Sequence, residues 1–579
     1  MKRPTISPAL LANITDAAPG RLVRKLDRAP NLAEDWGWNA SEGETSIETE
    51  SGETVTLGAE TLTDAEHVRC TCLLGPRCLH VLAVVTRLEL ADALASEPED
   101  EAQAPDPTSL LEEGQRQAAK KTWHTATTLL ELGATASGAM AQAELARALH
   151  GARAAGLHRL ASAGARAISG VRSLRERGSE FTLSAYTNAL LETLLVSGTI
   201  AHAPQEQKNV APSLLGTARR TYSPIGNLRL YGLFCEPIIA TAGYAGVATY
   251  LSDGKGRLYS VVDVVPAEMQ SAAGCYKKGV RLAETSLAHQ ELCREGLFMQ
   301  GATASADGRL GAGKGVKAVR AAGSAWQDAP LNELWQRPLS QQLEGAYQKL
   351  NLPLLERPAG GDLLFVNATI AGVDANALLL ETTEGMLLHG VAPNTHQALD
   401  YEHNLQLLAR AGGLTLSFIG RLLPATPRKI TLLAFSPTDK ESGVTHVNLP
   451  KAWTQRCNLG LDRMEASRFV GLAKHAKETT SPALEAGVDP LAALRRRVQR
   501  LALGGRATLP PEASQTIEAE ARQLEARMLR HASEVLCVLR QAGLSRGDAE
   551  KDTLARAFVA AASYLRHTET ALQRLCWAS

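Results

Sequence analysis

The chain has 579 residues, in which 61 Lys and Arg residues balance 61 Asp and Glu residues. A net charge of zero argues against a protein that binds nucleic acid through bulk charge, so any such surface must be a local patch. The length predicts about three to five domains. No apolar run approaches the roughly 18 residues of a membrane span, and no apolar leader follows Met1-Lys2-Arg3. Nine cysteines without framework spacing then predict a reduced, cytoplasmic protein.

The first predicted unit, residues 1–97, is built around a dense cluster of metal ligands. A hairpin of residues 44–49 and 53–57 precedes the segment Cys70-Thr-Cys-Leu-Leu-Gly-Pro-Arg-Cys-Leu-His80. Three thiols and one imidazole are the usual ligand set of a structural zinc site. Three buried free cysteines beside a helix are the alternative interpretation.

The expected local geometry places one ion among four side chains, which are those of Cys70, Cys72, Cys78 and His80. Residues i and i+2 of a strand share a face, so Cys70 and Cys72 would present both sulfurs together. Gly75-Pro76 would then turn the chain back, which places Cys78 in the turn. His80 would lie in the first turn of an apolar helix. His67 has the opposite strand parity, so we exclude it from the site.

The order C-x-C-x5-C-x-H resembles the SWIM-type zinc finger over roughly residues 44–90, and the ligands of that family map onto the same four side chains. Its five-residue spacer is short for the family, which tightens the loop but removes no ligand. Three later phrases look like bacterial SWIM zinc finger family proteins of about this length: Tyr231-Gly-Leu-Phe-Cys-Glu-Pro237, Gly243-Tyr-Ala-Gly-Val-Ala-Thr-Tyr250 and Gly308-Arg-Leu-Gly-Ala-Gly-Lys-Gly315.

The resemblance implies one structural Zn²⁺ and a finger that binds DNA, protein or both. It also implies a protein partner, such as a MoxR-type AAA+ ATPase or a von Willebrand A protein. The alternative function is a scaffold or adaptor subunit of that ATPase system, without nucleic-acid binding. Neutral net charge and abundant Ala-rich helices favour this alternative.

Basic side chains near the finger are the predicted contact surface for DNA or a partner, namely Arg24, Lys25, Arg69, Arg77 and Arg87. A second basic patch, residues 150–178, carries six arginines against the single acid Glu176. A solvated helical face is the favoured interpretation of that patch. Trp36 and Trp38 are predicted to pack on the small zinc-stapled core, with ligand stacking as the alternative.

The sequence as a whole predicts a multidomain α+β fold, which starts with the small ββα-type zinc finger. An acidic, Pro-rich linker at residues 98–107 leads to a helical domain at residues 108–205. Two β domains follow at 212–330 and 359–450, separated by a connecting helix within 331–358.

Each β domain predicts three strands, a helix and two strands, which is the element order of an OB-like barrel. A single mixed β-domain with inserted helices is the alternative. The helices are expected at 283–294 and 400–411. The strands are expected at 228–240, 244–251, 257–265, 297–303 and 316–322, and at 363–373, 377–382, 386–391, 414–423 and 429–435.

Residues 455–579 predict a C-terminal helical hairpin domain. Asp489-Pro490 is expected to begin a helix that Gly504-Gly505 ends. One long helix should follow and then a second, from about residue 548 to 577. The seam of the long helix steps by four and three residues, with a packing histidine within it, through Ile517, Ala521, Leu524, Met528, His531, Val535 and Val538.

Motifs for catalysis are missing from the sequence. Gly308 to Lys314 match most of a phosphate-binding P-loop, but Gly315 stands where Ser or Thr would hold magnesium. A Gly-rich turn between strands is the better interpretation. We find no H-E-x-x-H motif, no nucleophile elbow and no paired carboxylates. We therefore predict no enzymatic activity and no small-molecule substrate. A cryptic enzyme is the remaining alternative, and it would need a deep polar cleft between the β domains.

Overall fold

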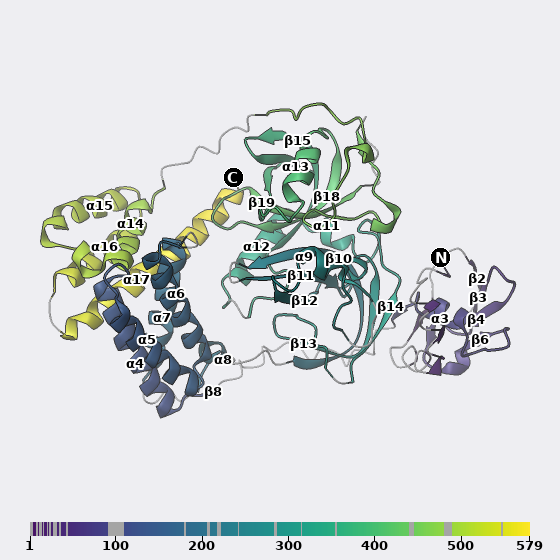
Figure 1. Cartoon of the computed structure of the whole chain (residues 1–579), viewed down its shortest axis with the longest axis horizontal. Helices are drawn as coiled ribbons and strands as arrows, with labels where there is room; N and C mark the ends of the chain where they lie inside the picture. The colour runs from purple at the N-terminus through teal and green to yellow at the C-terminus, as the bar shows by residue number, and fades with distance from the viewer. Residues whose placement is uncertain are drawn as a thin grey trace. The chain divides into compact units, whose positions relative to one another are not determined.

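The protein falls into two compact units, shown in the computed structural model of Figure 1. The first unit comprises residues 1–100, 221–482 and 577–579, and the second comprises residues 101–220 and 483–576. The residues that the structure describes are 4–6, 10, 14, 17–19, 21–22, 25–26, 32–33, 36–41, 44–90, 109–178, 181–204, 209–216, 222–240, 243–282, 287–313, 315–353, 356–438, 445–479, 489–545 and 548–578. The predicted linker at 98–107 lies outside them.

The N-terminal part of the first unit is a small α+β fold that contains the helix α3 (Leu79–Val85). Four antiparallel strands follow the order β2-β3-β4-β6: β2 (Gly37–Ser41), β3 (Glu44–Glu48), β4 (Thr54–Leu57) and β6 (Val68–Cys70). Three short parallel strands form a second sheet: β1 (Thr5–Ile6), β5 (Thr61–Leu62) and β7 (Glu89–Leu90). Alternate residues of the hairpin, such as Ile47, Val55 and Leu57, are fully buried, as strand periodicity requires.

A five-stranded antiparallel sheet follows, with the strand order β12-β11-β10-β13-β14. Its strands are β10 (Tyr222–Ala240), β11 (Tyr244–Ser252), β12 (Leu258–Pro266), β13 (Gly296–Ser305) and β14 (Lys317–Ala321). Two short helices, α9 (Ala272–Lys277) and α10 (His289–Leu292), lie between β12 and β13 in the chain. Within the described residues β12 and β14 do not pair, and one parallel bridge joins Ser260 to Arg309.

A second sheet has the same strand order and closes on itself. It contains β15 (Leu363–Asp374), β16 (Ala377–Thr382), β17 (Leu387–Val391), β18 (Thr415–Leu422) and β19 (Lys429–Pro437), with α13 (Tyr401–Ala409) between β17 and β18. The order is β17-β16-β15-β18-β19, and β17 pairs in parallel with β19. The short strand β21 (Cys457–Asn458) extends it beside β19, while β20 (His446–Val447) and β22 (Phe469–Val470) form a separate pair.

In each of these two sheets the first strand, β10 or β15, is long and pairs with two neighbouring strands. The C-terminal half of β10 pairs with β11 and its N-terminal half with β13, with a register shift between Gly232 and Phe234. β15 does the same with β16 and β18, and its shift lies between Ile370 and Gly372. Such irregularities bend a strand, which lets it leave one partner and join another. The predicted order of three strands, helix and two strands is confirmed for the second sheet.

The two large sheets of the first unit, β12-β11-β10-β13-β14 and β17-β16-β15-β18-β19, pack through residues that point outward from β10, β15, β18 and β19. Leu233, Phe234, Leu363, Phe365 and Ile419 are buried there, together with Trp326. The alternate residues of β15, such as Leu364 and Val366, face the other core. The predicted connecting helix is two helices, α11 (Glu333–Gln336) and α12 (Leu339–Leu350), because Pro338 interrupts the backbone hydrogen bonding.

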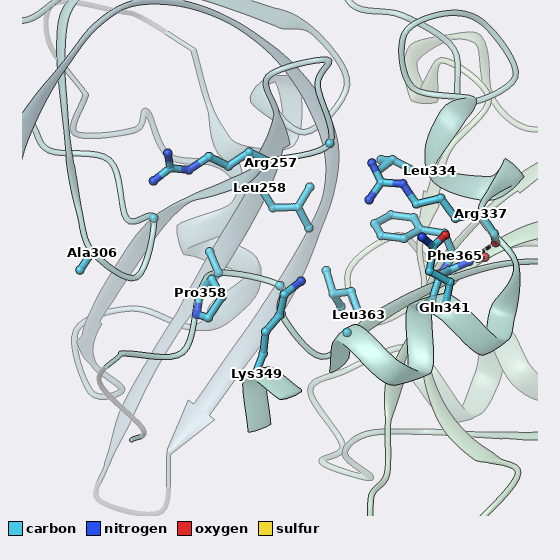
Figure 2. Close-up of a pocket in the computed structure, with 17 residues that line it drawn as sticks. Arg257, Leu258, Ala306, Leu334, Arg337, Gln341, Lys349, Pro358, Leu363 and Phe365 are labelled. Carbon is cyan, nitrogen blue, oxygen red and sulfur yellow. Dashed lines mark hydrogen bonds between the residues drawn. The ribbon is translucent and has the colours of Figure 1, made fainter. Parts of the chain in front are cut away.

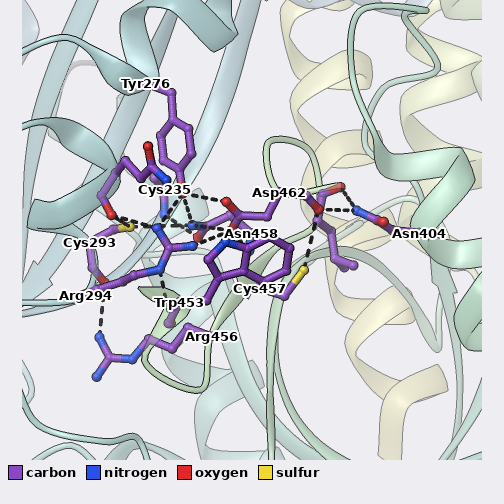
Figure 3. A network of polar contacts seen from close by, with 12 residues as sticks. Cys235, Tyr276, Cys293, Arg294, Asn404, Trp453, Arg456, Cys457, Asn458 and Asp462 are labelled. Atoms are coloured by element: carbon purple, nitrogen blue, oxygen red, sulfur yellow. Dashed lines mark hydrogen bonds and ion pairs between the residues drawn. The ribbon is translucent and has the colours of Figure 1, made fainter. Parts of the chain in front are cut away.

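A buried polar network also joins the two sheets (Figure 3). Asp462 accepts hydrogen bonds from Arg294 at 2.6 Å, from Tyr276 at 2.9 Å and from the backbone of Asn458 at 2.7 Å. The Asn458 amide reaches both sheets, since its oxygen accepts from the backbone N–H of Cys235 at 2.8 Å. One carboxylate therefore holds the side chains of Arg294 and Tyr276, which are distant in the sequence, together with the nearby Asn458.

The second unit is helical, and its main hydrophobic cluster draws on helices from both of its chain segments. Its helices are α4 (Glu113–Leu132), α5 (Ala139–Ala154), α6 (His158–Arg175), α7 (Leu183–Ala201), α8 (Pro212–Leu215), α14 (Ala492–Gly504), α15 (Ser514–Ala526), α16 (Arg530–Leu544) and most of α17 (Asp548–Ala578), with a small ribbon of β8 (Ser109–Leu110) and β9 (Asn209–Val210). We expected separate helical domains at 108–205 and 455–579. Instead, helices from both stretches bury their apolar faces in one hydrophobic cluster.

Two expectations for the C-terminal stretch are wrong. Residues 455–479 contain β21, β22 and one 3₁₀ helix, Ala466–Arg468, rather than α-helix. The single long helix is two helices, because Met528 adopts φ +63° between α15 and α16. The break rotates the buried face, so that α16 buries Leu536 and Leu539 while His531 is exposed. No helix among the described residues combines the length and apolarity that crossing a membrane requires.

Candidate metal centre

The first two sulfur ligands come from the end of a strand. Cys70 is the last residue of β6 and pairs with Val55 of β4. The ladder continues one step beyond the strand, where Thr71 donates its backbone N–H to Thr54 O at 3.0 Å. Cys72 follows, so its side chain lies two residues from Cys70 on the same side. A turn closes at Gly75, whose N–H donates to Cys72 O at 3.1 Å.

The remaining two ligands come from the start of α3. Cys78 is the N-cap residue, and its Sγ accepts a hydrogen bond from the Val81 N–H at 3.4 Å. His80 is the second residue of the helix, and its Nδ1 lies 3.8 Å from Cys70 Sγ. Trp36 packs edge-on against the His80 ring, with the centroids 5.9 Å apart. The ring therefore has a fixed orientation toward the sulfurs.

The four ligand atoms fit one zinc ion. They all lie within 4.8 Å of one another. A tetrahedral ion with Zn–S bonds of about 2.3 Å would place sulfurs ~3.8 Å apart, so a small inward adjustment completes the site. Three sulfurs and one nitrogen are ligands that zinc prefers. Gly75 permits the tight loop, because a Cβ there would lie 2.6 Å from Cys70 O.

The three thiols differ in pKa because their surroundings differ. Burial raises the pKa of Cys70 to about 12 and also raises the pKa of Cys78. The pKa of Cys72 is lowered: burial alone would raise it, but hydrogen bonds from the Leu74 backbone and the neighbouring thiols outweigh burial. Cys72 is therefore the first thiolate to form, and a bound Zn²⁺ would supply the positive charge that the other two thiolates need.

The structure brings together the four predicted ligands and leaves His67 outside, although the reason differs from the expected one. His67 belongs to a 3₁₀ helix, Ala65–His67, that precedes β6 and is not part of the strand. Strand parity therefore does not apply to it. The predicted packing role of the tryptophans is confirmed, since Trp36 is buried in the finger core and Trp38 packs against it.

The predicted contact residues have different settings. Lys25, Arg69 and Arg77 are exposed, and Arg87 is half-buried after α3. Arg24 lies outside the described residues. Arg69 follows the buried Val68 on β6, so its side chain points to the face of the sheet opposite the core. The finger surface is nevertheless acidic, since residues 44–90 contain eight Asp and Glu residues and three arginines.

The sequence interpretation missed one feature of the site. Leu73 is fully exposed and Leu74 is 56% exposed on the loop between Cys72 and Cys78. The spacing of the ligands could have predicted this exposure. A loop of five residues between two metal ligands is too short to fold its leucines back into the core.

Comparisons with known proteins agree with this geometry over a short segment. Residues 53–89 match the family model of the SWIM zinc finger. Searches of curated proteins and of solved structures found no match to the chain.

Proposed function

Because this chain carries a SWIM zinc finger at residues 53–89, we propose that it is an interaction protein whose finger binds a protein partner. One zinc ion, held by Cys70, Cys72, Cys78 and His80, would keep the contact loop in shape. The observation that carries the proposal is the exposed pair Leu73 and Leu74 between two of the ligands.

An exposed leucine pair is costly unless a partner covers it. Burying one leucine side chain stabilises a complex by about 1.5–3 kcal/mol, so the pair contributes roughly 3–6 kcal/mol. That range corresponds to about 10²–10⁴ in affinity. The loop is held at Cys72 and Cys78, so little conformational entropy is lost when it binds.

The charge of the finger favours a protein over DNA. Eight acidic residues face three arginines within residues 44–90, and three thiolates with one Zn²⁺ add a further net charge of −1. A negative surface repels a phosphate backbone and attracts a basic protein surface. The partner that fits is therefore a protein with an apolar pocket bordered by Lys or Arg. A MoxR-type AAA+ ATPase or a von Willebrand A protein is our first candidate for it.

The nine free cysteines are compatible with a reducing compartment, and we place the protein in the cytoplasm on that ground.

DNA binding is the second candidate, supported by the exposed Arg69 and Arg77 beside the ligands.

We also propose that the two central sheets are tandem OB-like barrels, because they share one strand order and the second closes through a parallel β17–β19 pair. Single-strand binding by such barrels uses exposed aromatic rings. Phe234 and Tyr259 are buried, and Tyr250 stacks on Phe234 with centroids 4.8 Å apart. Of these four aromatic residues, Tyr244 has the exposed ring that stacking on a base requires, since it is 47% exposed.

The test compares two pairs of apolar-to-serine substitutions in the full-length, zinc-loaded protein. Leu73→Ser with Leu74→Ser removes the apolar contact, whereas Val264→Ser with Met269→Ser changes exposed apolar residues outside the finger. Immobilised protein is used to capture partners, and the captured protein is then purified and titrated by calorimetry. We expect at least a hundredfold loss of affinity for the loop variant, and unchanged affinity for the control.

Two results would overturn the proposal. One is a partner that binds the loop variant as tightly as the wild type. The other is tight binding of a 30-base-pair duplex whose log affinity falls steeply with log salt, which would favour the DNA alternative.

A further inference from the structure

A cavity of about 390 Å³ lies between the two sheets of the first unit (Figure 2). The turn between β11 and β12 forms one wall, α11 and α12 form another, and the segment that leads into β15 forms the third. This volume falls in the range of about 300–1,000 Å³ that is typical of small-molecule sites. The cavity is separate from the metal centre in the fold.

The lining of the cavity is positively charged. Arg257, Arg337 and Lys349 contribute to it, and the lining contains no carboxylate within the described part of the chain. The nearby Asp362 is paired with Arg421 at 3.0 Å. Among the described residues neither Arg337 nor Lys349 has an ion-pair partner. In Figure 2 both cationic groups point into the opening between Leu258 and Phe365.

The two cations are close enough to affect each other. The pKa of Lys349 is lowered, first by burial of its ammonium group and then by the neighbouring Arg337 guanidinium, and these two effects outweigh the Asp362 carboxylate, which raises it. Two like charges that face one cavity repel each other, and an anion between them would remove that repulsion. Arg257 lies over the Tyr259 ring at 5.3 Å, so its guanidinium has a defined position at the edge of the cavity.

The cavity also has an apolar wall, formed by Leu258, Leu334, Leu363 and Phe365. Gly345 leaves room in front of α12, because nothing lies within 4 Å of a Cβ placed there. A ligand that fits must therefore combine an anionic group with an apolar or aromatic body. A free inorganic anion would leave the apolar wall uncovered.

We propose that this cavity binds a small organic phosphate of nucleotide size. Lys349 and Arg337 hold the phosphate groups, and the ring system packs against Leu258 and Phe365. Guanidinium and ammonium groups are the usual protein donors to phosphate. The site goes beyond the function proposed for the finger and does not depend on zinc.

The experiment measures ATP without magnesium by isothermal titration calorimetry, at low ionic strength, with the full-length protein. Lys349→Gln and Arg337→Gln should each weaken ATP binding at least tenfold, because each removes one phosphate contact. Lys451→Gln, an exposed lysine away from the cavity, is the control and should bind like the wild type. Inorganic pyrophosphate should bind more weakly than ATP. Adenosine, which has the ring system without phosphate, should give no measurable heat of binding.

A pair of substitutions at one position separates charge from space. Gly345→Glu places a carboxylate one helical turn before Lys349, where it can pair with the ammonium, and Gly345→Gln fills the same volume without charge. We expect ATP binding to fall at least tenfold further for the glutamate than for the glutamine. Both variants should fold, since Gly345 has open space and lies within a helix.

Three results would overturn the assignment: no heat of ATP binding at millimolar concentration, equal binding by the wild type and all cavity variants, or an oligodeoxythymidine that binds the wild type but not the cavity variants while ATP and pyrophosphate do not bind.

Discussion

Replacing Asp462 with asparagine tests whether the buried network holds the two central sheets together. The substitution preserves the shape of the side chain and removes its charge. Asp462 accepts four hydrogen bonds, which come from Arg294, from Tyr276 and from the backbone and amide of Asn458. The side chains of Asp462 and Arg294 are 3% and 2% exposed. The variant therefore leaves a guanidinium buried without its counter-charge.

The expected loss is about 3–5 kcal/mol, the usual cost of removing one partner from a buried ion pair. Asp400→Asn in the same unit is a matched control, because Asp400 also pairs with an arginine, at 2.7 Å, but Arg463 is 64% exposed. Exposed pairs contribute about 0–1 kcal/mol. With a urea m value of ~3 kcal/mol/M, the midpoint should fall by about 1–1.7 M for Asp462→Asn and by less than ~0.3 M for the control.

The assay is pulsed hydrogen exchange during urea unfolding, read by mass spectrometry. Peptides from β10, β13 and β21 report on the first unit, and peptides from α4 and α7 report on the second. Only the first group should shift in Asp462→Asn. Equal midpoints for Asp462→Asn and Asp400→Asn would show that Arg294 does not depend on the carboxylate, and the reasoning would then be wrong.

Three further predictions use other parts of the chain. Cys72→Ser should abolish the zinc content of about one ion per chain, measured by atomic emission, and expose the finger to limited proteolysis while α4–α7 stay protected; zinc content equal to the wild type would contradict the ligand assignment. Glu520 has a lowered folded pKa: burial alone would raise it, but hydrogen bonds from Arg497 and Arg496 outweigh burial. The contribution of the Glu520 carboxylate to the free energy of unfolding should be complete above its ordinary pKa of 4.5. It should disappear as the pH falls through the lower pKa of the folded state. Glu520→Gln should therefore lower the unfolding midpoint of α14 and α15 at pH 7 and converge with the wild type in acid; a constant difference at every pH would refute this. Gly133→Ala should cost about 2–4 kcal/mol, because φ is +75° and a Cβ would lie 2.2 Å from Gly505 N, whereas Gly151→Ala, in open space on α5, should stabilise by about 0.5–1 kcal/mol; equal thermal unfolding of both variants would contradict the packing argument.

The metal centre was predictable because its ligands are close in sequence. Eleven residues from Cys70 to His80 contain all four ligands, and a strand end, a tight turn and a helix start are sufficient to assemble them. The β-strands were also predictable, since alternating apolar residues and Gly-rich turns are local signals.

Long-range packing decided the rest. The apolar spacing around Met528 continues without interruption, yet the chain breaks there, and α15 and α16 bury their apolar faces in one cluster with helices from residues 113–201. The contacts of Asp462 with Arg294 and Tyr276 join residues about 170–190 positions apart, and Arg337 and Arg257 line one cavity that neither sheet forms alone. Spacing along the chain therefore determined the zinc ligands by itself. The buried network, the helical core and the charged cavity arise only when distant segments meet, because burial and electrostatic pairing depend on the tertiary neighbours.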